Sequence, residues 1–417
     1  MADRAPAPIV ISPLFETEPD IRVRVRQAVE TVRIECPTPI EASVPEARPL
    51  VLVAPVIASS LPTGLRLTSG VGEAFDIGPG LDVTLVPIAA SGSSPAQRPA
   101  AHLRIDGADF PGALTLRRAS DTSPLAFDVI ATMAIEDYLP GVLAKELFAN
   151  WPLAAYEAQA VCARTYALFV RGLDRAAGRA FDVENSQADQ VYGGATTNVT
   201  ALRAVRNTRG VVLTYGGALF KTYYSSTCGG RAGSAADVWP ISRGFEYNLA
   251  PPIQGAGRDH YCQAARLYRW EATRTADELG KRLAAWGRNA GHAVRSIGSV
   301  RGVSVEKVNQ TSRPSRYSVI DDRGRTFSLS GEELRVACNF SAEGYPAITP
   351  QTRVNSNDLE FIQMPATELT FLVRGRGFGH GVGMCQWCLK GMADRGIPWD
   401  QQVLTFYPGA QIMRGYN

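Results

Sequence analysis

The chain has 417 residues, of which 45% are hydrophobic and 20% are charged, so its composition is that of a folded globular protein rather than a disordered or fibrous one. At about 150 residues per domain, this length predicts two to three domains, each with a core of its own. The 43 basic and 40 acidic residues give a formal net charge of +3 and form no long run of like charge, which argues against a nucleic-acid partner.

Neither a membrane span nor an export signal is evident. The longest apolar stretch, around residues 50–61, contains Pro55 and falls well short of the ~20 residues that cross a bilayer. The first residues lack the basic, apolar and small-residue order of a signal peptide, as they would if a leader had been removed. We therefore expect no transmembrane segment.

Short alternating runs dominate residues 21 to about 130, such as Ile21-Arg-Val-Arg-Val and Thr31-Val-Arg-Ile-Glu. This alternation is typical of β-strands. The small, polar and proline-containing segment 90–100 is expected to be a surface loop. We predict a β-rich N-terminal domain over residues 1–125.

Two helices are expected after Glu136. The first is short and runs through residue 147, with Pro140 in its first turn, where the missing N–H of proline costs nothing. The second runs from near Pro152 to about Arg171 and is apolar or small nearly all the way round, which predicts a centrally buried helix.

Gln159 and Arg164 are polar residues inside this second helix. A buried charge is costly without a partner, so we expect an anionic group to meet Arg164.

Strand-like and helical segments alternate in the rest of the chain, with expected strands at 211–215, 219–224 and 316–320 and an expected helix at 276–286. The sequence thus predicts a mixed, β-rich α+β fold with a central buried helix, a β-rich N-terminal region and a small inserted subdomain. The predicted divisions after the N-terminal domain are a first part of the core at 126–264, the inserted subdomain at 265–350, and a second part of the core at 351–417.

Glycine occupies every second position from Gly375 to Gly383, in the run Gly-Arg-Gly-Phe-Gly-His-Gly-Val-Gly. On a strand, this period would place all five glycines on one face. Glycine weakens a strand, so the pattern indicates that a backbone or a ligand approaches closely. Two interpretations stay open: packing of the central helix on a glycine-faced strand, and a ligand groove.

Glu146 is a carboxylate in an otherwise apolar stretch, Val142-Leu-Ala-Lys-Glu-Leu-Phe. Partial burial there would raise its pKa, and such an acid can donate a proton to a leaving oxygen near neutral pH. The alternative is a helix-surface glutamate paired with Lys145 or Arg164.

Four of the seven cysteines could form a cluster. Cys385 and Cys388 make a CxxC pair, and Cys228 and Cys262 would complete a four-thiolate zinc site if the fold brought them there. A disulfide or free buried thiols are the alternatives.

Several motifs, taken in order, resemble the stage II sporulation protein D and amidase-enhancer family. They are Glu136-Asp-Tyr-Leu-Pro-Gly-Val-Leu-Ala-Lys-Glu-Leu, Trp151-Pro, Ala158-Gln-Ala-Val-Cys-Ala-Arg-Thr-Tyr-Ala, Gln190-Val-Tyr-Gly-Gly, Tyr224-Ser-Ser-Thr-Cys-Gly-Gly, Val238-Trp, the glycine run through Met384-Cys-Gln-Trp, and Phe406-Tyr-Pro-Gly. They cover most of 125–265 and 370–417.

The resemblance implies action on bacterial cell-wall glycan outside the cytoplasm. Catalytic members are lytic transglycosylases, which cut peptide-stripped glycan strands and leave 1,6-anhydro-muramic ends without a required cofactor. The family's catalytic glutamate falls on Glu146 and a required arginine on Arg164, whose implied role is to orient Glu146 or to bind a lactyl carboxylate. Four further residues are candidates for lining the glycan groove: Tyr192, Tyr224, His380 and Gln386.

Two other features of the family bear on this chain. Some members stimulate a partner amidase without cutting glycan themselves, which gives a second functional hypothesis. Some bind zinc through the cysteine before Gly-Gly and a histidine soon after it, but here no histidine follows Cys228 until His260. Cys388 stands where the family usually has glycine, which favours a local metal site or disulfide.

Overall fold

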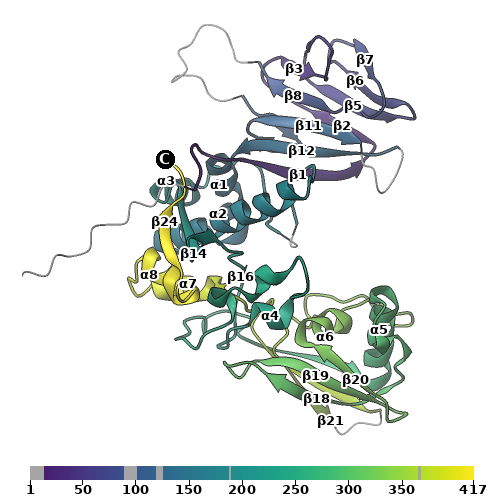
Figure 1. The fold of residues 1–417 in the computed structure, drawn as a ribbon. Helices are drawn as coiled ribbons and strands as arrows, with labels where there is room; N and C mark the ends of the chain where they lie inside the picture. Colours follow the sequence, from purple (N-terminus) through teal and green to yellow (C-terminus); the bar gives the residue numbers. More distant parts are fainter. Residues whose placement is uncertain (1–13, 89–100, 119–124, 187–188, 365–367) are drawn as a thin grey trace, which may run out of the picture. The chain divides into compact units, whose positions relative to one another are not determined.

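The computed structural model describes residues 14–88, 101–118, 125–186, 189–364 and 368–417 (Figure 1). The chain forms two compact units. Unit 1 comprises Met1–Asn150, Ala163–Val212 and Ile412–Asn417, and unit 2 comprises Trp151–Cys162 and Leu213–Gln411. The predicted β-rich α+β class is confirmed. The surface loop expected at 90–100 lies outside the described residues.

Unit 1 contains a seven-stranded sheet with the order β13-β1-β12-β11-β8-β3-β4. Strand β1 (Asp20–Val29) pairs antiparallel with β12, and its alternate residues Ile21, Val23 and Val25 are buried, as the alternating sequence predicts. The other strands are β3 (Ile40–Ser43), β4 (Leu50–Leu52), β8 (Val83–Pro87), β11 (Ala113–Arg118), β12 (Phe127–Ala134) and β13 (Val183–Glu184).

A second sheet of unit 1 has the order β2-β5-β6-β7, and a separate hairpin joins β9 and β10. These strands are β2 (Thr31–Ile34), β5 (Val56–Leu61), β6 (Gly64–Thr68), β7 (Ala74–Ile77), β9 (Leu103–Ile105) and β10 (Ala108–Phe110). The strands expected in the first part of the chain are therefore present (Figure 1).

Helix α1 (Ile135–Glu146) follows β12 without a loop. The expected short helix exists, but its predicted start was wrong, since Pro140 lies inside α1 rather than in its first turn. The apolar residues at Ile135, Leu139 and Val142 are fully buried. Their burial extends the helix toward its N-terminus in spite of the hydrogen bond that Pro140 cannot donate.

Helix α2 (Leu153–Ala176) is the predicted central helix. Residues 158–168 are buried all round, as the sequence predicted. Its residues 153–162 belong to unit 2 and its residues 163–176 to unit 1. Unit 1 also holds α3 (Val199–Asn207), which Asn198 caps by accepting a hydrogen bond from the backbone N–H of Ala201.

The segments of unit 2 that contain the Tyr224 and Met384 motifs form short strands and helices. Strand β16 (Tyr224–Ser225) pairs in parallel with β23 (Met384–Cys385), and α7 (Gln386–Ala393) and α8 (Trp399–Phe406) follow. The helical turns α4 (Ala235–Val238), η2 (Glu246–Leu249) and η3 (Pro251–Ile253) precede the loop that contains Cys262. A further sheet has the order β15-β14-β24 and contains β14 (Val211–Tyr215), β15 (Ala218–Leu219) and β24 (Gln411–Arg414), of which residues 211–212 and 412–414 belong to unit 1.

A hydrophobic core of its own lies in unit 2 between Trp270 and Val373. One sheet has the order β17-β22-β21, from β17 (Arg269–Thr275), β21 (Leu359–Met364) and β22 (Thr370–Arg376), and another has the order β18-β19-β20, from β18 (Val300–Val308), β19 (Pro314–Asp321) and β20 (Thr326–Ser330). Helices α5 (Ala276–Ala290) and α6 (Gly331–Cys338) pack together beside the β18-β19-β20 sheet, with the turn η4 (Ala293–Ser296) after α5 (Figure 1). The expected helix at 276–286 and strand at 316–320 are confirmed.

The glycine run is not one strand, so that prediction was wrong. Strand β22 ends at Arg376, and the four glycines from Gly377 to Gly383 have φ between 67° and 89°, which is the left-handed region that glycine alone enters easily. The predicted close approach is present. A Cβ at Gly383 would lie 2.1 Å from the carbonyl oxygen of Tyr223, so the neighbour is a loop backbone rather than the central helix.

Candidate functional site

The six residues proposed for catalysis and glycan binding divide between the two units. Glu146, Arg164 and Tyr192 belong to unit 1, whereas Tyr224, His380 and Gln386 belong to unit 2. The geometry of each group follows within its own unit.

Glu146 is the last residue of α1 and is partly exposed. The buried Tyr138 lies about two turns earlier on the same helix, and its hydroxyl donates to the side-chain oxygen of Gln190 at 3.0 Å. Burial raises the pKa of Tyr138 well above its usual value, and the negative charge of Glu146 adds to this effect. The Glu146 carboxylate therefore lies within electrostatic range of this tyrosine.

Arg164 meets the anionic group that its burial predicts, and that group is Glu136. The arginine is 0% exposed, and its Nε and Nη2 donate to the two carboxylate oxygens of Glu136 at 3.0 and 2.8 Å. Such a bidentate pair has the strongest geometry available to arginine and carboxylate. Pairing of Arg164 with Glu146, which the sequence left open, is not what the structure shows.

The Glu136–Arg164 pair is completed by backbone and hydroxyl groups. Arg164 Nη1 donates to the carbonyl oxygen of Val211 at 3.0 Å, and the N–H of Gly210 donates to Glu136 Oε1 at 3.0 Å. The hydroxyl of Tyr416 donates to the same carboxylate oxygen. The network joins α1, α2, the turn before β14 and the C-terminal segment inside unit 1.

Sequence reasoning missed Glu136 as the partner of Arg164, although it opens the motif that contains Glu146. The signal was a second acidic residue followed by a buried helical face. The i+3 and i+7 neighbours of Glu136, Leu139 and Leu143, are fully buried, so a carboxylate on that side of α1 needs a cation.

Tyr192 is a core residue of unit 1, with 3% of its surface exposed. Its ring lies 5.0 Å from that of Tyr138 and 6.1 Å from that of Phe110, between ring centroids, and its hydroxyl donates to the Met133 sulfur at 3.2 Å. A Cβ at Gly141 of α1 would lie 2.5 Å from the tyrosine ring. This burial argues against a direct sugar contact and favours a role in seating α1.

His380 packs among aromatic rings in unit 2. Its ring centroid lies 4.8 Å from that of Trp239, which stacks on Tyr223 at 3.8 Å. Its Nδ1 accepts from the N–H of Val382 at 3.0 Å, and a second hydrogen bond joins the ring to the backbone of Tyr224. Burial lowers the pKa of His380 from 6.5 to about 4, so the ring is neutral at pH 7.

Gln386 and Tyr224 lie on paired elements of unit 2. Tyr224 of β16 is opposite Met384 of β23, and Gln386 starts α7 directly after β23. Gln386 is buried, and its Nε2 donates to Oε1 of Gln159 on α2 at 3.4 Å. Tyr224 is partly exposed and is the more accessible of the two.

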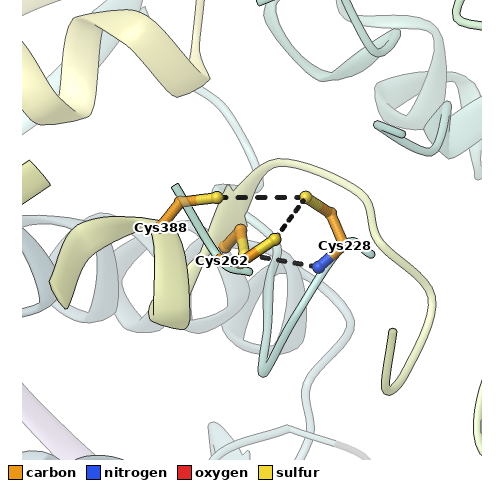
Figure 2. A group of neighbouring side chains, drawn as sticks. Cys228, Cys262 and Cys388 are labelled. Atoms are coloured by element: carbon orange, nitrogen blue, oxygen red, sulfur yellow. Dashed lines mark hydrogen bonds between the residues drawn. The ribbon is translucent and has the colours of Figure 1, made fainter. Parts of the chain in front are cut away.

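The fold brings the four predicted cysteines together. Figure 2 shows Cys228, Cys262 and Cys388 converging from separate segments, and Cys385 completes the group, with all four sulfurs within 4.8 Å of one another. The Sγ of Cys228 lies 3.7 Å from that of Cys262 and 4.0 Å from that of Cys388. His260 Nδ1 lies 3.3 Å from the Cys228 sulfur.

The protonation of this cluster is uneven. The pKa of Cys228 lies well below its usual value because the thiols of Cys262, Cys385 and Cys388 hydrogen bond to its sulfur. Burial raises the pKa of Cys385 well above its usual value. Hydrogen bonding with Cys228 would raise the pKa of Cys262, but hydrogen bonds from Cys385 and Cys388 outweigh that effect and lower it to about 7, so Cys228 and Cys262 are the more acidic thiols of the cluster.

A cavity of about 860 Å³ in unit 2 borders the start of the glycine run. Gly375 lines it, and four of the charged residues of its wall form the ion pairs Arg231–Asp358 and Arg374–Glu271. The later glycines lie against protein backbone or side chains. Close packing therefore describes Gly375 as well, since a Cβ there would lie 1.9 Å from the ring of Trp270, although this glycine also lines the cavity.

Comparison with known proteins supplies the family. A model of the stage II sporulation protein family, SpoIID, matches residues 125–215. The stage II sporulation protein D of Bacillus subtilis is 27% identical over 318 residues, which cover 72% of this chain and 81% of that protein. The chain is therefore similar to the SpoIID family.

Two further proteins are similar to this chain. An uncharacterized protein of Brachyspira hyodysenteriae is 28% identical over 314 residues, which are 75% of this chain and 74% of that protein. A Bacillus subtilis protein named amidase enhancer is 25% identical over 295 residues, which are 66% of this chain but 40% of the relative. The resemblance predicted from the motifs is confirmed.

The segment matched by the SpoIID model contains some of the predicted site residues but not others. Residues 125–215 include Glu146, Arg164 and Tyr192, together with the Glu136 partner, whereas the four-cysteine cluster lies beyond the matched segment. Among the described residues, no helix combines the length and the apolar character that a bilayer crossing needs.

Proposed function

We propose that this protein is a lytic transglycosylase of peptidoglycan. It would cleave peptide-stripped glycan strands between N-acetylmuramic acid and N-acetylglucosamine and leave 1,6-anhydro-muramic ends. The observation that carries the proposal is the position of Glu146, a partly exposed carboxylate at the end of a helix that a buried ion pair holds in place.

One carboxyl group is enough for this reaction. Ordinary glycosidases need two, an acid and a nucleophile or base. In the proposed reaction the 6-hydroxyl of the muramic residue is the nucleophile. Glu146 protonates the glycosidic oxygen as that bond breaks and then takes the proton from the 6-hydroxyl as the anhydro bond forms, so no water is consumed.

The place of Glu146 on α1 supports the proton-donor role. The C-terminal end of a helix carries partial negative charge, which makes an ionised carboxylate less favourable there than elsewhere. This effect favours the protonated acid that the first step requires.

Arg164 serves this reaction as a positioning residue rather than by touching substrate. It is fully buried and both of its terminal nitrogens donate to protein acceptors. It fixes Glu136 at the start of α1, and thereby the direction in which the same helix presents Glu146.

A second candidate function is the stimulation of a cell-wall amidase. The relative named amidase enhancer supports it. A protein with either function would meet its substrate outside the cytoplasm, where peptidoglycan lies, so we propose that location as well.

The deciding experiment incubates the full-length protein with peptide-free glycan strands and identifies the fragments by mass spectrometry. The parent is expected to yield anhydro ends, and Glu146→Gln to lose them at least a hundredfold with an unchanged circular dichroism spectrum. Glu157→Gln is the matched control, because Glu157 is another partly exposed helical glutamate. If the parent cuts nothing but accelerates an added amidase, the second function replaces the first.

A further inference from the structure

The four-cysteine cluster of unit 2 is built from three separate segments. Cys228 lies in the loop after β16, Cys262 lies in the loop before β17, and Cys385 and Cys388 belong to the end of β23 and the first turn of α7. All four side chains are at most 1% exposed. Burial alone is ordinary for cysteine, and Cys162 and Cys338 are also fully buried, but the cluster differs from them in that its four sulfurs lie within 4.8 Å of one another.

The spacing of the sulfurs fits one metal ion. A zinc–sulfur bond of about 2.3 Å places two corners of a tetrahedron roughly 3.8 Å apart. The two separations from the Cys228 sulfur, 3.7 and 4.0 Å, lie on either side of this value. A disulfide needs about 2.05 Å between sulfurs, and an iron–sulfur cluster separates its cysteine sulfurs by the width of the cluster.

The surroundings suit thiolates rather than thiols. The backbone N–H of Cys228 points at the Cys385 sulfur at 3.3 Å, and the N–H of Tyr261 points at the Cys388 sulfur at 3.4 Å. Cys385 caps α7 and Cys388 lies in its first turn, where the helix dipole favours negative charge. Donors of this kind are the usual outer partners of metal-bound sulfur.

We propose that Cys228, Cys262, Cys385 and Cys388 bind a single zinc ion as a closed structural site. Four protein ligands leave no open position for water or substrate, so the ion would fix the fold rather than act on glycan. His260 would support the site from outside by hydrogen bonding to the Cys228 thiolate. The site is independent of the proposed glycan chemistry and stands or falls separately from it.

The ion would hold three segments of unit 2 in register. The Cys262 loop leads into β17, at the start of the separate core, and the Cys228 loop continues into Gly229, which lies against Arg376 and Gly377. The CxxC turn starts α7. One ion would thus fasten the separate core of unit 2 to the β16–β23 pair.

The first test measures metal in the full-length protein by inductively coupled plasma mass spectrometry. One zinc per chain is expected for the parent, and Cys388→Ser should bind zinc at least roughly tenfold more weakly. Cys338→Ser is the matched control, since Cys338 is also fully buried but lies outside the cluster, and it should keep its zinc. His260→Ala should keep one zinc as well, whereas loss of zinc in that variant would replace the four-cysteine set with a histidine-containing one.

A second test needs no variant, in case Cys388→Ser does not fold. The parent is stripped with a chelator and titrated with Co²⁺, which should give the visible bands of a tetrahedral thiolate site at one equivalent. Amide exchange at Cys228 and Tyr261 should speed up at least tenfold on stripping, since both N–H groups donate to the sulfurs. A parent with no metal and no cobalt bands, or one that holds iron in place of zinc, overturns the proposal.

Discussion

Arg164 and Glu136 face each other as a bidentate ion pair inside unit 1, with nitrogen–oxygen distances of 3.0 and 2.8 Å. The pair joins the start of α1 to the middle of α2, and Glu146 is the last residue of that same α1. A requirement for Arg164 in glycan cleavage therefore follows from the helix that it holds, without any contact between Arg164 and the substrate.

Breaking this pair should cost stability as well as activity. Glu136→Gln leaves the Arg164 charge buried without its partner, and we expect unfolding free energy to fall by about 3–5 kcal/mol in urea denaturation. Asp76→Asn is the control, because the Arg66–Asp76 pair has similar geometry but is exposed, and it should change stability little. Equal effects in the two variants would contradict the role assigned to the buried pair.

Substitutions at Glu146 and at Arg164 should affect activity and stability differently. Glu146→Gln should lose glycan cleavage and keep its unfolding free energy within about 1 kcal/mol, since Glu146 is partly exposed. Arg164→Lys should lose both, because one ammonium cannot replace the two parallel donors of the guanidinium. An Arg164→Lys variant that is stable yet inactive would instead indicate that Arg164 touches the glycan.

Tyr192 should behave as a core residue. Tyr192→Phe removes only the hydrogen bond to the Met133 sulfur, so cleavage should stay within about twofold of the parent and stability should fall by about 1 kcal/mol. Tyr192→Ala should cost about 3–5 kcal/mol, because it empties a space against Tyr138 and Phe110. A large loss of cleavage in a fully stable Tyr192→Phe would restore the sugar-contact interpretation.

The sequence predicted helices and strands well where the pattern of apolar residues along the segment was clear. Alternation from Ile21 to Val25 predicted β1, and the all-round apolar character of residues 158–168 predicted the buried α2. The helix start at Ile135 was missed because Pro140 is a strong local signal, and burial of the preceding turn outweighed it. Tertiary packing, which is not visible along the chain, made that difference.

The candidate site was predictable as residue types but not as pairings. Burial of Arg164 required an anion, yet Glu136 lies 28 residues away and only the packing of α1 on α2 selects it over Glu146. The four cysteines are separated by up to 160 residues, so their convergence depends on the β16–β23 pairing. The alternation of glycines suggested a strand because positive φ angles leave no separate mark in the sequence.

His380 should make unit 2 sensitive to acid. Its pKa of about 4 in the folded protein lies below the usual 6.5, so between these values the unfolded chain binds one more proton and stability falls as pH falls. The slope contributed by this residue is at most about 1.4 kcal/mol per pH unit, and the loss is complete below pH 4. Glu332 opposes the effect, and Arg313 and Arg335 reinforce it.

The measurement compares urea denaturation of the parent and His380→Asn at several pH values between 7.5 and about 4. The variant should be less stable at pH 7.5, since it loses the ring contacts with Trp239, but its stability should fall less steeply toward acid. Acid effects on the cysteine cluster are common to both proteins and cancel in the difference. Parallel curves would show that His380 does not titrate in this way.

Substitutions in the glycine run can separate two reasons for glycine at Gly383: a neighbouring backbone that leaves no room for a Cβ, and a left-handed backbone conformation. Gly383 and Gly396 have similar φ angles of 67° and 75°, so alanine at either position pays about 1–2 kcal/mol for the left-handed backbone. At Gly396 a Cβ would meet nothing within 4 Å, whereas at Gly383 it would lie 2.1 Å from the Tyr223 carbonyl oxygen. Gly383→Ala must therefore push the 223–225 segment away from β23, and it should destabilise unit 2 by several kcal/mol more than Gly396→Ala in urea denaturation. Equal losses would mean that the glycines serve only the backbone conformation and that the 223–225 segment moves aside freely.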